Sequence, residues 1–225
     1  MAVVLAALVV AGAGYAVFAF QSSGGPAPVS LGAATPSAAA SGSGDPGGTS
    51  GTWSVQTSGS FVGYRVREKL AFLPAPSDAV GRTSAVTGTM TIAGRTIEAV
   101  AVQADLSKLT SNEARRDQRM QTMGLETDTF PTATFRLSTP IVLDAKPKRG
   151  EVVKTTATGA FTLHGVTRTI TIPVQARWDG ATIEVVSSFP VRFSDYAIQA
   201  PNFAGFVSVQ DSGTVELELV FAKSA

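Results

Sequence analysis

Most of the chain after residue 52 alternates between apolar and polar side chains with a period of two. In one segment Val215, Leu217, Leu219 and Phe221 share a single parity, and several earlier segments repeat the pattern. Successive side chains of a strand point to opposite faces, so this alternation is typical of strands with one buried and one solvated face. Parallel sheets favour continuous apolar runs with intervening helices. The pattern therefore predicts an antiparallel sheet.

One segment departs from the alternation. Residues 110–124, TSNEARRDQRMQTMG, contain good helix formers, with Thr110 and Glu113 in capping-box spacing and Gly124 as a stop. A single short helix within a long series of strands predicts an all-β barrel or sandwich with one helical crossover. About eight strands in the remaining length fit an antiparallel barrel wide enough for one ligand.

The amino terminus has a different pattern. Residues 1–20 are apolar from Ala2 to Phe20 without a charged side chain, which is about the length that spans a bilayer. We interpret this segment as a transmembrane helix or uncleaved signal anchor, although no Lys or Arg precedes it. A signal peptide cleaved near Ala19 and a buried core helix are the alternatives. Either membrane-targeting interpretation predicts a single-pass or secreted protein whose carboxyl-terminal domain lies outside the cytoplasm.

Residues 21–52 contain almost only Gly, Ser, Ala, Pro and Thr, with Asp45 as the one charged residue. Such a composition predicts a disordered linker, because it buries too little apolar surface to offset the entropy of ordering. The folded domain then covers residues 53–225. The formal net charge is only +1, which does not favour a nucleic-acid partner, and the absence of Cys excludes thiolate chemistry.

The chain has one histidine, His164, within TGAFTLHGVTRTITIPV at residues 158–174. Apolar positions are odd before it, at Phe161 and Leu163, and even after it, at Ile170 and Ile172. A parity change across His-Gly predicts the tip of a hairpin. Catalysis would need an orienting carboxylate and a nucleophile nearby, and no metal-ligand spacing is present. The sequence therefore favours a protein that is not an enzyme, without cofactor or metal.

Several pieces of the chain together resemble the YceI family. They are WSVQTSGSFVGYRV, AVTGTMTI, LTSNEARRDQRMQTMGLETDTFPTATFRL, TGAFTLHGVTRTITIPV, FPVRFSDYAI and VSVQDSGTVELELVF, in this order between Trp53 and Phe221. The resemblance implies a lipocalin-like antiparallel β-barrel that holds a polyisoprenoid chain in an elongated cavity. Gln56 and Gly59-Ser60 replace the family's usual Asp and His-Ser, and the loop at residues 68–86 is longer than usual and suggests a lid or an altered mouth.

A polyprenyl chain needs an apolar lining, and each buried CH₂ contributes about 0.8 kcal/mol. The inward parity of the strands, together with this resemblance, predicts a lining made of Phe135, Phe161, Leu163, Ile170, Ile172, Phe189, Val191, Phe193, Leu217 and Leu219. The same residues would also fill an ordinary packed core. The residues assigned to contact a lipid head group or to form the cavity mouth are Arg116, Asp117, Arg119 and Tyr196. The alternative for Arg116 and Asp117 is a local ion pair that fixes the helix.

Three functions follow from these features. The first is a membrane-tethered lipid-binding protein that transports, stores or sequesters an isoprenoid such as a polyprenyl phosphate or a quinone. The second is a non-catalytic interaction or stress-response domain of the cell envelope with a packed barrel. The third is an isoprenoid-modifying enzyme that uses His164 or Asp117.

Overall fold

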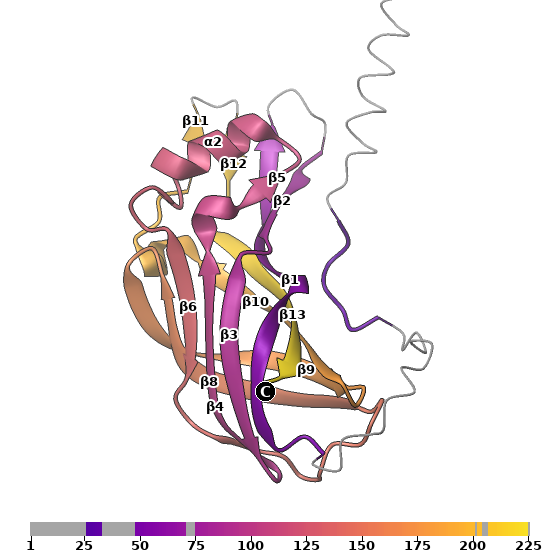
Figure 1. The fold of residues 1–225 in the computed structure, drawn as a ribbon. Coiled ribbons are helices and arrows are strands. Elements are labelled where there is room, and N and C mark those ends of the chain that lie inside the picture. Colours follow the sequence, from indigo (N-terminus) through magenta and orange to yellow (C-terminus); the bar gives the residue numbers. More distant parts are fainter. Residues whose placement is uncertain (1–25, 33–47, 71–74, 201, 204–206, 225) are drawn as a thin grey trace, which may run out of the picture.

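The computed structural model describes residues 26–32, 48–70, 75–200, 202–203 and 207–224. Its eight barrel strands are β1 (Gly51–Leu70), β3 (Val86–Ala93), β4 (Thr96–Asp105), β6 (Thr132–Leu137), β8 (Val152–Leu163), β9 (Val166–Trp178), β10 (Thr182–Arg192) and β13 (Ser212–Lys223). They pair antiparallel in the order β1–β13–β10–β9–β8–β6–β4–β3, and β3 pairs back onto β1 (Figure 1). The predicted eight-stranded antiparallel barrel is therefore confirmed.

Other elements gather at the end of the barrel drawn uppermost in Figure 1, which we call the upper end. They are β2 (Ser77–Thr83), β5 (Thr110–Ser111), α2 (Ala114–Thr122), β11 (Asn202–Phe203) and β12 (Val207–Val209), together with the 3₁₀ turns η1 (Leu106–Lys108) and η2 (Phe193–Tyr196). The opposite, lower end carries β7 (Ile141–Val142) and the turn between β3 and β4.

The predicted single short helix is confirmed, but it starts later than the capping-box spacing indicated. Thr110 and Ser111 form β5, which pairs with β2, so the helix begins only at Ala114. The Glu113 side chain caps it by accepting a hydrogen bond from the backbone N–H of Arg115. The long first loop is also mostly strand, because β1 continues to Leu70 and β2 pairs with its second half.

A bulge in β1 explains how one strand serves both ends of the barrel. Its register against β13 shifts between Gln56 and Phe61. Trp53 is buried on the odd parity before the shift, whereas Val62 points into the interior on the even parity after it. The extra residues let the strand bend while its apolar side chains stay on the inner face.

No helix among the described residues is long and apolar enough to cross a membrane. Residues 1–20 lie outside the described residues, so the transmembrane helix stays a prediction. Within the predicted linker, residues 26–32 lie in extended form along the outside of the barrel (Figure 1). We call these residues the N-terminal strap.

Candidate ligand-binding site

The barrel interior contains a cavity of about 150 Å³. Its wall is apolar apart from a few hydroxyl side chains, such as those of Thr155 and Ser187. The lining residues come from all eight barrel strands and from the loop after β7, which contributes Leu143 and Pro147. Because the inward side chains of neighbouring strands leave this space unfilled, the interior is hollow and not fully packed.

Six of the ten residues predicted to line a cavity do so: Phe135, Phe161, Ile172, Phe189, Leu217 and Leu219. The other four lie elsewhere in the core. Leu163 and Val191 are buried, and Ile170 and Phe193 pack against the core half-buried, but none of these four lines the cavity. Their inward parity is correct. They differ from the six lining residues in their position along the barrel axis, because they lie toward the upper end, where side chains fill the core.

Sequence reasoning missed many lining residues of the β3–β4 hairpin and of the lower end. Examples are Met90, Ile92, Val100, Val102 and Trp178. Their parity would have identified the first four, since they alternate with polar or outward residues. Trp178 is a lining residue, and its indole N–H is buried without an acceptor among the described residues.

The volume limits what the barrel holds without rearrangement. An apolar cavity of this size stays dry and accommodates a molecule of about the size of benzene. A chain of several isoprene units therefore requires the lining side chains to move apart.

Aromatic side chains close the cavity toward the upper end. The rings of Phe161 and Phe189 meet edge to face at 5.7 Å, and Tyr196 of η2 packs on the other side of Phe161 at 5.5 Å. Phe161 and Phe189 line the cavity, whereas Tyr196 does not. Tyr196 is 3% exposed, and burial raises the pKa of its hydroxyl. Tyr196 is assigned from the sequence to a ligand head group or to the cavity mouth, but its side chain lies behind the cavity wall and does not line the cavity.

His164 fastens this closure. The predicted hairpin tip is present: His164 and Gly165 both have positive φ, 50° and 72°, in a two-residue turn between β8 and β9. Unlike an ordinary turn tip, the side chain is buried at 8% exposure. Its Nδ1 lies 3.1 Å from the backbone oxygen of Tyr196, and its Nε2 lies 3.1 Å from Oε2 of Glu126.

Backbone strain collects at the same place. Besides His164, the non-glycine residues with positive φ in the described part of the chain are Glu126 and Ala197, at 47° and 54°. Glu126 is a direct partner of His164, and Ala197 directly follows Tyr196. The ring of Phe130 also stacks on His164, with centroids 4.1 Å apart. Such conformations persist only where surrounding contacts hold them. Here the contacts of His164 join three segments at the upper end: the β8–β9 turn, residues 126–130 and η2.

Arg116 and Asp117 of α2 contact β1 and β5 and not the cavity. Arg116 donates from Nη2 to Oε1 of Glu68 at 2.8 Å, and Asp117 accepts hydrogen bonds from the backbone and hydroxyl of Ser111. The ion pair that fixes the helix is thus with Glu68 and not with Asp117. Arg119 is exposed on α2, and none of these three residues lines the described cavity.

A half-buried tyrosine lies near these contacts. Tyr64 of β1 is close to Arg116, Asp117 and Glu68, and burial raises its pKa to about 12 despite the opposing charge of Arg116. No group of three or more acidic or histidine side chains gathers for a metal in the part of the chain that the structure describes. The contacts described at this end are hydrogen bonds and an ion pair that hold α2 to β5 and β1.

An eight-stranded antiparallel barrel around an apolar cavity defines the class of lipocalin-like barrels. Within that class, the chain belongs to the YceI-like family, since the model of the YceI-like domain matches residues 53–221. This match covers nearly all of the barrel.

Solved structures agree with this fold. A polyisoprenoid-binding domain from Saccharophagus degradans, described as implicated in plant cell wall breakdown, is 20% identical, with a TM-score of 0.61 over 76% of this chain and 98% of that one. BcnA of Burkholderia cenocepacia is also 20% identical, with a TM-score of 0.56 over 74% of this chain and 98% of that one. No curated protein matches the sequence.

Proposed function

We propose that this protein binds an isoprenoid lipid inside the barrel and does not catalyse a reaction. The observation that carries the proposal is the cavity inside the barrel with its almost wholly apolar wall. The family supports the same ligand class, since a similar structure is described as polyisoprenoid-binding. A packed interaction domain is the weaker candidate, because the interior is hollow.

The polar donor of Trp178 bears on the ligand's chemistry. An apolar tail satisfies the lining, whereas a carbonyl or hydroxyl group near the lower end would accept from the indole N–H. A quinone or a short polyprenol carries such a group. We therefore expect ligands with one neutral acceptor to bind better than pure hydrocarbons.

Membrane attachment completes the proposal. The apolar segment at residues 1–20 supports a single-pass anchor with the barrel outside the cytoplasm. In this arrangement the protein transports, stores or sequesters lipid drawn from the membrane beside it.

Binding is tested by native mass spectrometry and organic extraction of the purified protein, followed by uptake of quinone or polyprenol. Ala157 lines the cavity, and its neighbour Thr156 is exposed on the outer face of β8. Ala157→Trp should fill the cavity and abolish uptake, whereas the matched control Thr156→Trp should bind normally. Equal uptake by both variants, or no uptake by the unmodified protein, would overturn the proposal.

A further inference from the structure

The outer face of β2, β1 and β13 is covered, although strand parity would leave it in water. Gly63 lies opposite both Glu216 and Arg82, so these residues share the outward face, as does Val80 opposite Arg65. Yet Glu216 is 1% exposed and Val80 is 5% exposed. An outward carboxylate this deeply buried indicates a built site on the barrel wall.

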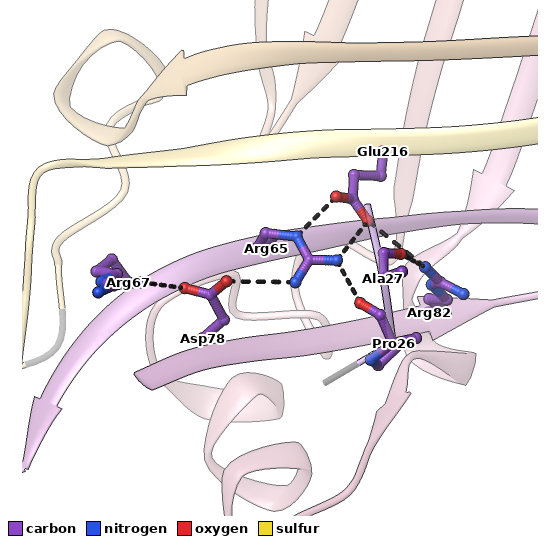
Figure 2. Close-up of polar contacts among 7 residues, drawn as sticks. All are labelled: Pro26, Ala27, Arg65, Arg67, Asp78, Arg82 and Glu216. Carbon is purple, nitrogen blue, oxygen red and sulfur yellow. Dashed lines mark hydrogen bonds and ion pairs between the residues drawn. The ribbon is translucent and has the colours of Figure 1, made fainter. Parts of the chain in front are cut away.

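The N-terminal strap lies on this face. Arg65 donates from Nη2 to the carbonyl oxygen of Pro26 at 2.6 Å, and Arg82 donates to that of Ala27 at 3.3 Å (Figure 2). At the other end of the strap, Nη1 of Arg177 on β9 donates to the carbonyl oxygen of Gly32 at 2.7 Å. Since β13 and β10 separate β1 from β9, the strap crosses several strands.

The strap itself has the alternation of a docked extended segment. Val29 and Leu31 are half-buried, whereas Pro28, Ser30 and Gly32 are exposed. The prolines lack N–H groups and favour extended backbone, which leaves carbonyl oxygens as the groups to be recognised. The barrel supplies donors for these oxygens, and the two apolar side chains turn toward it.

Each strap-binding arginine is held by a carboxylate. Glu216 contacts Nε of Arg65 at 2.7 Å and Nη2 of Arg82 at 3.6 Å, as Figure 2 shows, and Glu184 contacts Nη2 of Arg177 at 2.6 Å. Because Arg65 and Arg82 share Glu216, these pairs offset only part of the guanidinium charge, but they fix the guanidinium planes and leave further N–H groups free to donate. The acceptors that these arginines contact are backbone carbonyl oxygens, so the site suits an uncharged peptide backbone.

Gly63 makes the arrangement possible. A Cβ at this position would meet the backbone oxygen of Gly81 at 2.2 Å and Cγ of Arg82 at 2.8 Å. The absence of a side chain lets Arg82 lie across β1 toward Glu216, while its guanidinium also covers the ring of Phe61 at 4.1 Å.

We propose that this arginine-lined outer face is a docking site for an extended, uncharged, proline-containing segment, occupied in cis by residues 26–32. One consequence rests on the proposed membrane anchor. With the strap docked, residues 21–25 alone connect the predicted anchor to the barrel. A segment of this length spans at most about 20 Å. The strap would then hold one face of the barrel toward the membrane, which a free linker would not do.

The test uses the full chain in detergent. The chain contains no cysteine, so spin labels can be attached at two introduced ones, Ser30→Cys on the strap and Thr169→Cys on β9. Double electron–electron resonance should give one narrow distance distribution. Arg82→Gln combined with Arg177→Gln should broaden it, and the control pair Arg115→Gln with Arg136→Gln, both exposed elsewhere, should not.

A strap-side variant guards against unfolding of the barrel. Val29→Ser with Leu31→Ser alters only the strap and should also broaden the distribution. A broad distribution in the unmodified protein, or a narrow one that survives both variants, would overturn the proposal. The measurement contains no lipid, so failure of isoprenoid binding leaves its outcome unaffected.

Discussion

The Nδ1 atom of His164 lies 3.1 Å from the backbone oxygen of Tyr196, across 32 residues of sequence. This contact ties the β8–β9 turn to η2, whose Tyr196 ring packs on Phe161 in the cavity wall. The histidine thus acts on the cavity indirectly, by holding the wall that closes it.

Loss of the His164 side chain should destabilise the barrel more than an ordinary turn substitution. Both His164→Ala and His164→Asn remove the contacts with Tyr196, Glu126 and Phe130, which we expect to cost about 1–3 kcal/mol of unfolding free energy. Asn tolerates positive φ better than Ala, so it should be the milder change. Urea denaturation measures both. A loss below about 0.5 kcal/mol in each variant would show that the junction is dispensable.

Enlarging the cavity should lower the stability of the empty protein and let it bind a longer ligand. Leu219 lines the cavity and is buried, and Leu219→Ala should lower the unfolding free energy of the empty protein by about 2–5 kcal/mol. A longer isoprenoid should bind this variant more tightly than the unmodified protein, because its tail fills the new space. Thermal unfolding with a series of prenol lengths measures both effects. Val220→Ala, one residue away, does not alter the cavity lining and should not change the preferred length.

The role assigned to Arg116 predicts a stability effect without a ligand effect. Arg116→Gln leaves the largely buried Glu68 carboxylate without its charged partner and should cost about 1–3 kcal/mol. Arg115→Gln removes an exposed charge from the same helix and should cost little. Binding of a polyprenyl phosphate should be the same in both variants. A selective loss in Arg116→Gln would restore the head-group interpretation.

Tyr64 should make the protein sensitive to alkali. Burial raises its pKa from the ordinary value of 10.0 to about 12, so between these values the unfolded chain releases a proton that the folded chain retains. The unfolding free energy should therefore be unaffected by this group below pH 10 and should fall as the pH rises toward 12. In Tyr64→Phe the fall over this range should be shallower. Parallel denaturation curves from pH 9 to 12 measure the difference, and identical slopes would contradict it.

Strand parity was the most informative feature of the sequence. It identified the inward face of β8, β9, β10 and β13 correctly, and the parity change at His164 located the hairpin turn. Parity does not report height along the barrel axis, so Leu163 and Val191 could not be separated from Phe161 and Phe189. That distinction depends on how far the strands stagger and on what covers each end.

Long-range partners were also beyond a single sequence. The partner of Arg116 is 48 residues earlier in the chain, at Glu68, and local spacing favoured Asp117 instead. The burial of His164 depends on Glu126 and Tyr196, which no local pattern connects to it. The composition of residues 21–52 could not indicate the contacts that residues 26–32 make, because the arginine donors are on strands remote in sequence.

The sequence by itself determined the antiparallel strands, the short helix among them and the apolar inner face, since these follow from side-chain alternation and local propensity, which act between near neighbours. Only the tertiary structure decided that the interior is hollow, that His164 fastens the upper closure, and that Arg65, Arg82 and Arg177 face the strap. These features depend on closure of the barrel, which brings distant strands to fixed separations and so determines which side chains meet and which leave a space.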